Sequence, residues 1–205
     1  MFRKSLLVTT LVASIAGNTA AFAGPEAEVL HWWTSGGEAK SVAVLQKEFA
    51  ENGGKWTDMP VAGGGGDAAM TALRARVLSG NAPTAVQLKG PSIQEWYEEG
   101  ALADISSVAE SNGWAKVLPA SIASHMKCEG KWCAAPVNVH RIDWIWANAD
   151  VLASAGVGMP RTWDEFNETA EKLKAKGITP LAHGGQAWQD ATVFEAVALG
   201  IGGAN

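Results

Sequence analysis

The chain lacks the charge balance that suits nucleic acid or an anionic membrane. Its 205 residues include 16 Lys or Arg and 21 Asp or Glu, so basic side chains are in the minority. A surface with this balance repels phosphate, which argues against nucleic acid or anionic lipid as a partner. Beyond the N-terminus, the sequence also lacks any run of the ~20 apolar residues that a membrane-spanning helix needs.

The apolar stretch at the N-terminus has the pattern of an export signal. Arg3-Lys4 precedes a mostly apolar run from Leu6 to Ala16, and Ala21-Phe22-Ala23 has the small-x-small pattern of a cleavage site. This run is too short to span a bilayer, so we expect residues 1–23 to be removed on export. Removal of residues 1–23 takes away Arg3 and Lys4 and no acidic residue. The remaining chain has 14 basic and 21 acidic residues, which gives a formal charge of −7.

Cysteine is scarce too, since only Cys128 and Cys133 are present. The segment between them begins with Glu129-Gly130, which is typical of a tight turn, and in an exported protein this pattern predicts a disulfide across a hairpin. A metal site that uses both cysteines and His125 is the alternative, but the spacing fits no common zinc pattern and a fourth ligand is not evident. We therefore expect a disulfide, no metal and no other cofactor.

Short β-type runs alternate with amphipathic helical patterns, which predicts an α/β fold with a largely parallel sheet. The predicted strands cover residues 28–33, 55–61, 84–88 and 178–183. The predicted helices cover residues 38–50, 93–99, 162–176 and 191–199, together with one that has Asp67 as its N-cap and ends near Ser79. A hairpin leads into an extended segment, residues 134–146. Thr162 and Glu165 form a capping box.

The most informative stretch is His31-Trp32-Trp33-Thr34-Ser35-Gly36-Gly37-Glu38. Side chains alternate between the two faces of a strand, so two adjacent tryptophans at its end cannot both enter the core. We expect one of Trp32 and Trp33 to face a cleft or solvent. A flat indole beside the carboxylate of Glu38 suits a sugar, which has a C–H face and a rim of hydroxyls. The alternative for Glu38 is a favourable acid in the first turn of a helix.

Other polar residues fall where open α/β sheets bind ligands, at the carboxyl ends of strands. Lys89 follows an apolar strand, and Gln87 shares its side by strand alternation. The glycines at 63–66 lack the Gly-Lys-Ser/Thr of a phosphate loop and precede Asp67, so we expect their backbone to approach a ligand. Lys89 could instead be an ordinary surface lysine.

Two further residues are candidates for the same site, with structural roles as the alternative. His140 lies in the extended segment, and Trp188 follows a glycine pair and precedes Gln189-Asp190. The tryptophans that we expect to pack in the core or at a hinge are Trp96, Trp114, Trp144, Trp146 and Trp163.

Several segments, taken in order, resemble the bacterial extracellular solute-binding proteins that supply ABC sugar importers, and most closely the glucose/mannose-binding type. They are residues 30–38, 62–67, 80–83, 87–90, 136–141 and 160–166. The resemblance implies the two-lobed, type II periplasmic binding protein fold. Residues 24–148 would form the N-terminal lobe and residues 149–205 the beginning of the second. A monosaccharide would bind between lobes that close by hinge bending.

The resemblance also implies roles for residues here. Trp32 and Trp33 would contact the sugar, and Glu38 and Lys89 would bond its hydroxyls. Gln87 and the backbone of Gly65 and Gly66 would assist. The protein would be a periplasmic monomer that delivers sugar to a membrane permease and catalyses no reaction. Since the chain ends in the glycine-rich Gly200–Asn205, we expect the natural C-terminus to lie further on.

Two alternatives stay open. A secreted glycoside hydrolase needs a second carboxylate opposite Glu38, for which Asp143 and Asp190 are candidates. The same fold could also bind an oligosaccharide or a glycerol-phosphate; phosphate favours arginine, and only Arg141 is a candidate.

Overall fold

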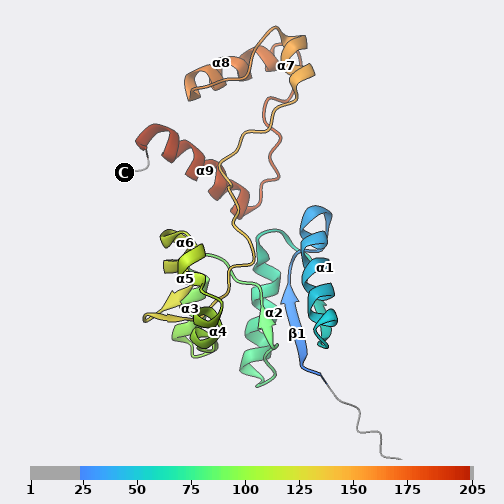
Figure 1. Ribbon diagram of the computed structural model, residues 1–205. Helices are drawn as coiled ribbons and strands as arrows, with labels where there is room; N and C mark the ends of the chain where they lie inside the picture. Colours follow the sequence, from blue (N-terminus) through green and yellow to red (C-terminus); the bar gives the residue numbers. More distant parts are fainter. Residues whose placement is uncertain (1–23, 204–205) are drawn as a thin grey trace, which may run out of the picture.

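The computed structural model describes residues 24–203, so the predicted export signal lies outside the described residues. The elements form two groups joined by extended chain (Figure 1). The first group contains β1–β5 and α1–α6, and the second contains α7, α8 and α9. Within the described part, no helix is both long enough and apolar enough to cross a membrane.

A three-stranded parallel sheet lies at the centre of the first group, with strand order β2-β1-β3. The central strand β1 (Glu26–His31) pairs with β2 (Lys55–Pro60) along its whole length and with the short β3 (Ala85–Val86) near its end. The predicted α/β fold and parallel pairing are confirmed. The strand ends differ, since β1 stops at His31 and neither tryptophan of the doublet belongs to it.

Helices α1 (Gly36–Glu51) and α2 (Asp67–Leu78) connect the strands, and the start of α2 differs from the prediction. Asp67 is the first helical residue, not the N-cap. The N-cap is Gly66, which has a φ of 89° and makes no side-chain cap bond. Glycine adopts this left-handed conformation without steric cost. The short 3-10 turn η1 (Gly64–Gly66) leads into the helix, so backbone conformation sets where α2 begins.

The main core lies between the sheet and α2, with a contribution from α3 (Ser92–Glu98). Leu30 from β1 is fully buried and packs with Ala69 and Leu73 from α2 and with Trp96 from α3. Trp96 is 6% exposed, so its predicted core position is confirmed.

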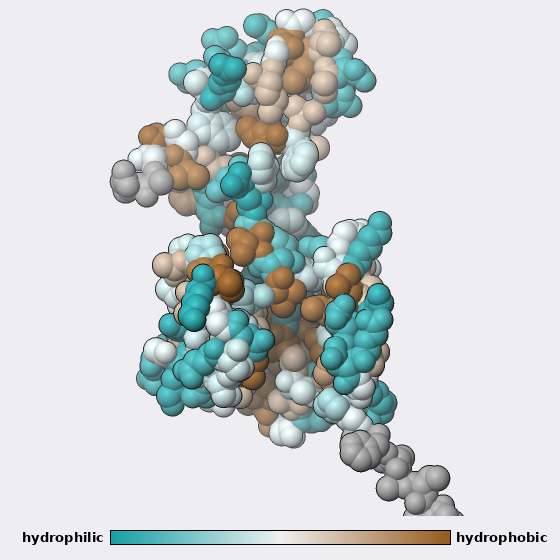
Figure 2. All heavy atoms as spheres, viewed as in Figure 1, coloured by the Kyte–Doolittle hydropathy of each residue, from teal (hydrophilic) through white to brown (hydrophobic). Residues whose placement is uncertain are grey.

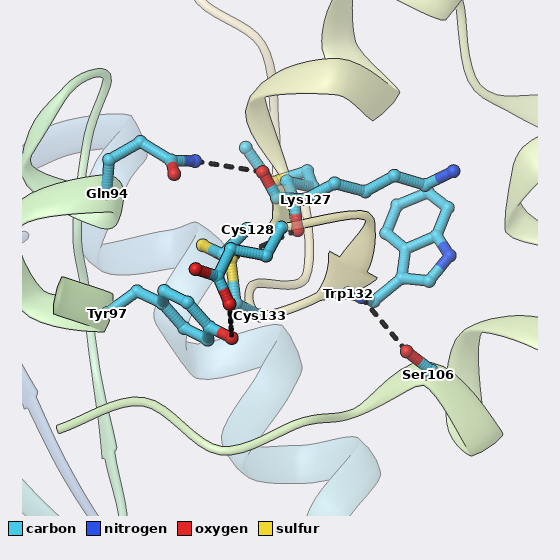
Figure 3. The surroundings of a disulfide bond; sticks show 9 residues. Gln94, Tyr97, Ser106, Lys127, Cys128, Trp132 and Cys133 are labelled. Atoms are coloured by element: carbon cyan, nitrogen blue, oxygen red, sulfur yellow. Dashed lines mark hydrogen bonds between the residues drawn. A yellow bond between two sulfur atoms is a disulfide. The ribbon is translucent and has the colours of Figure 1, made fainter. Parts of the chain in front are cut away.

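The first group also contains a hairpin with a disulfide bond (Figure 3). Strands β4 (Lys127–Cys128) and β5 (Lys131–Trp132) pair antiparallel, and Cys128 is bonded to Cys133 as predicted. Because the two sulfur atoms are bonded to each other, the alternative metal site with His125 is wrong. Ser106 Oγ accepts a hydrogen bond from the Trp132 N–H at 3.0 Å, which attaches the hairpin to the helical segment beside it.

Three short helices between the main core and the hairpin were not predicted from the sequence. They are α4 (Ser106–Ser111), α5 (Trp114–Val117) and α6 (Ala120–His125). Each is six residues or shorter, so its hydrophobic periodicity is too brief to distinguish a helix from a loop.

The second group contains α7 (Ala149–Ala155), α8 (Trp163–Lys174) and α9 (Ala187–Gly202). The predicted N-cap of α8 is confirmed, because Thr162 Oγ1 accepts from the Glu165 N–H at 3.1 Å. The Glu165 carboxylate bonds the Arg161 N–H, one residue before the cap. The predicted strand at residues 178–183 is wrong: this segment has no paired strand in the described chain.

Apolar side chains remain exposed along the chain that joins the two groups, as Figure 2 shows for the region between them. Trp144 is 54% exposed and Trp146 is 90% exposed. The prediction that these two tryptophans pack in a core or hinge is therefore wrong in this structure. The segment is extended as expected, but it follows the surface and no described strand pairs with it.

Candidate functional site

The carboxyl ends of β1 and β2 border a hollow of about 290 Å³, which we call the β1–α1 hollow. It lies where open α/β sheets bind ligands. Its lining comes from the end of β1 and the turn after it, from one face of α1 and from β2: His31, Trp33, Thr34, Ala39, Val42, Gln46, Asp58 and Pro60. One indole and several polar side chains therefore share one concave surface.

Trp33 forms the aromatic wall of the hollow. Its side chain is only 6% exposed, and its indole is stacked with the imidazole of His140, with ring centroids 5.8 Å apart and planes 13° from parallel. Trp33 lines the hollow, as expected of one ring of the doublet, but little of its surface is open to solvent. The ring is covered, and the structure brings it to His140 from the extended segment.

Trp32 belongs to a different environment. Its half-buried indole packs against the main core, and its backbone N–H donates to Gln87 Oε1 at 3.1 Å. A β-carbon placed on Gly66 would lie 2.9 Å from the indole, so the ring lies directly against that glycine. The structure thus brings together three predicted site residues, Trp32, Gln87 and Gly66. In this arrangement Gln87 Oε1 accepts its hydrogen bond from the backbone of Trp32.

Glu38 and Lys89 are not brought to the hollow. Glu38 lies in the first turn of α1, where an acid favours the helix dipole, and its side chain is exposed. Lys89 is exposed just before α3, and its backbone carbonyl accepts from Ser92. Neither residue lines the β1–α1 hollow. The predicted grouping of both charges around the doublet is not assembled in this structure.

The hollow also contains a histidine–aspartate pair that the sequence did not predict, in which the histidine is buried and the aspartate side chain is 40% exposed. His31 is 5% exposed, and its Nε2 lies 2.9 Å from Asp58 Oδ1. Asp58 also accepts from Gln46 Nε2 at 3.0 Å and from Trp56 Nε1 at 2.9 Å. Burial raises the pKa of the Asp58 carboxyl, but the hydrogen bonds from Trp56, His31 and Gln46 outweigh it and hold the pKa below its ordinary value. The carboxylate is therefore charged at neutral pH.

The pair depends on strand register, and for this reason it is hard to predict from the sequence. Asp58 pairs with Val29, two residues before His31, so the two polar side chains are diagonal neighbours on the sheet face that α1 covers. His31 Nδ1 is buried and has no hydrogen-bond partner in the described chain. Two strands that each contain a polar residue predict a contact between these residues only when the register of the strands is known.

The four glycines at 63–66 form a segment that we call the glycine loop, and Trp188 lies against two of them, Gly64 and Gly65. A β-carbon on Gly64 would lie 2.6 Å from Trp188 Nε1, and one on Gly65 would lie 3.0 Å from the same indole. Figure 1 shows the N-terminal end of α9 over the start of α2, in agreement with this contact. The structure therefore joins the predicted residues Gly65 and Trp188 across the two groups of elements.

The described residues contain no cluster of three or more His, Cys, Asp or Glu side chains arranged to hold a metal ion. The polar and aromatic groups that line the hollow are indole, imidazole, amide, hydroxyl and carboxylate groups.

Comparison with known proteins identifies the family. A family model described as bacterial extracellular solute-binding protein matches residues 33–205. The chain belongs to this family. It is 54% identical over 200 residues to a probable sugar-binding periplasmic protein of Rhizobium meliloti. The aligned residues make up 98% of this chain and 48% of that relative. A Brucella melitensis protein of the same name is 56% identical over 175 residues, 85% of this chain and 42% of that relative.

Solved structures agree on the fold. The chain is similar to a chitin oligosaccharide binding protein, with a TM-score of 0.65 and 22% identity over 82% of this chain and 42% of that chain. The family and the periplasmic binding protein fold implied by the resemblance are confirmed. The chain spans about half the length of the curated relatives it matches.

Proposed function

We propose that this protein acts in the periplasm as the sugar-binding receptor of an ABC transporter. Two relatives that share 54% and 56% of their aligned residues with it are named probable sugar-binding periplasmic proteins. Sequence identity at this level supports a shared class of ligand. The observation that carries the proposal is the β1–α1 hollow, in which Trp33 and Asp58 line one surface.

The composition of the hollow favours a sugar. An indole provides an apolar surface for the C–H face of a pyranose, and an ionised carboxylate forms a stronger hydrogen bond with a hydroxyl than a neutral acceptor does. Asp58 provides that charge, and Thr34 and Gln46 add a hydroxyl and an amide. The volume of about 290 Å³ is at the small end of the range for ligand pockets, so we propose a monosaccharide, of the glucose or mannose type, as the ligand.

Binding would then shift the protein toward a closed form. The second group of elements would cover the sugar, with Trp188 on that side, and the permease would recognise the closed form. Glu38, Gln87 and Lys89 do not line the β1–α1 hollow in this structure, and we propose them as further sugar contacts in the closed form. Glu38 follows β1, and Gln87 and Lys89 follow β3, so all three belong to the carboxyl edge of the sheet. Sugar contact by Trp32 and by the backbone of Gly65 and Gly66 is proposed for the same reason.

Titration calorimetry with a panel of aldohexoses and short oligosaccharides tests this function. We expect saturable heat with at least one monosaccharide. Trp33→Ala should reduce its affinity by about tenfold to a hundredfold, as loss of a buried aromatic anchor does. The matched control is Trp146→Ala, since Trp146 is 90% exposed and does not line the hollow.

Heat with oligosaccharides alone would contradict the monosaccharide proposal, and no heat with any sugar would contradict the receptor. Chromogenic glycosides give a separate check: we expect no turnover, and turnover would favour the hydrolase alternative.

A further inference from the structure

The contact between Trp188 and the glycine loop joins the two groups of elements. Trp188 is the second residue of α9, and its Nε1–H donates to Gln186 Oε1 at 2.7 Å, which fixes the direction of the indole. Gln189 Oε1 accepts from the Gln186 N–H at 3.1 Å, so the start of the helix is itself held. The indole is therefore presented by a well-defined helix end.

The glycine loop lacks the side chains that would prevent this approach. A β-carbon at Gly64 would lie 2.6 Å from Trp188 Nε1 and 2.8 Å from Gln186 Oε1, closer than real β-carbons approach their neighbours. All three nearest atoms belong to Gln186 and Trp188, which lie in the other group. A side chain at Gly64 would thus obstruct the contact without crowding its own part of the fold.

Gly64 differs from the other three glycines of the loop in its backbone conformation. Gly63, Gly65 and Gly66 have φ values of 146°, 72° and 89°, which other residues rarely adopt. Gly64 is not among the residues with positive φ, so its conformation is open to alanine. At Gly63, Gly65 and Gly66 a positive φ favours glycine. At Gly64 a side chain is instead opposed by Trp188 and Gln186, which occupy the space that a β-carbon would need.

We propose that Gly64 and Gly65 form a docking surface for Trp188, and that this contact sets how closely α9 approaches the carboxyl edge of the sheet. Docking covers part of the indole, which remains 38% exposed, and so gives the two groups a preferred arrangement. The inference concerns a contact within the protein, and it does not depend on which ligand binds.

Two-dimensional ¹H–¹⁵N NMR of the protein without sugar tests the contact from both sides. Gly64→Ala should displace the indole N–H signal of Trp188, because the added methyl group occupies its position. Trp188→Ala should shift the backbone N–H signals of Gly64 and Gly65, because an aromatic ring current is lost. Gly158→Ala is the matched control: a β-carbon there meets nothing within 4 Å, and Gly158 is not among the residues with positive φ, so neither set of signals should move.

An unchanged Trp188 indole signal in Gly64→Ala, together with unchanged Gly64 and Gly65 signals in Trp188→Ala, would overturn the proposal. If Gly64→Ala removed the dispersion of all indole signals, the variant would be unfolded, and Trp188→Ala alone would decide: shifted Gly64 and Gly65 signals support docking, and unshifted signals refute it. Since no sugar is present, either result is independent of the calorimetry that tests the receptor function.

Discussion

Replacement of Leu30 by alanine should destabilise the first group of elements strongly. Leu30 lies on the central strand, pairs with Met59 on one side and with Val86 on the other, and has no exposed surface. Backbone pairing on both sides prevents β1 from moving to fill a cavity, and Trp96 is a rigid neighbour in the same core cluster. The variant should therefore leave a cavity that collapses only in part.

Buried leucine-to-alanine changes cost about 2–5 kcal/mol, and the restraint around Leu30 favours a loss of about 3–4 kcal/mol in the free energy of unfolding. Urea unfolding followed by circular dichroism measures this loss. Leu78→Ala in α2 is the matched control, because that leucine is 82% exposed and its replacement should change stability by less than about 0.5 kcal/mol. Equal effects of the two substitutions would refute the placement of the core.

Three further predictions follow from local contacts. Arg76 bonds both oxygens of Glu28, at 2.7 and 2.6 Å, and these bonds hold the pKa of Glu28 below its ordinary value of 4.5. The stability that this pair contributes is present above pH 4.5 and is lost as the pH falls through the lowered pKa of Glu28. Glu28→Gln should therefore weaken the dependence of the unfolding midpoint on acid pH. An unchanged dependence would argue against the pair. Cys128→Ser opens the disulfide and should cost about 2 kcal/mol in the chain-entropy model, with reduced wild type as the comparison. Thr162→Ala should lower stability by about 1 kcal/mol through loss of the α8 cap, whereas Thr162→Ser should retain most of it.

The alternation of apolar runs was sufficient to predict the α/β fold, because strands and helices differ in period over lengths that the sequence displays. The disulfide and the Thr162 cap were predictable for a similar reason: each depends on residues close together in the chain. The predicted strand at residues 178–183 failed because a strand is defined by its partner, and no described segment pairs with it.

The site was less predictable, since it depends on strand ends and register. The expectation for the doublet assumes a strand that continues to Trp33, but β1 ends at His31, so strand alternation does not apply to Trp32 and Trp33. Trp32 turns to the core, and Trp33 lines the hollow under His140. The pairing of His31 with Asp58 follows from the β1–β2 register, which the sequence does not display.

A crystal structure of the protein with a bound aldohexose, chosen by calorimetry, tests the central claim most directly. We predict a pyranose in the β1–α1 hollow, its C–H face on the indole of Trp33 and a hydroxyl hydrogen-bonded to Asp58. A sugar bound elsewhere on the protein, with the hollow left empty, would contradict this account.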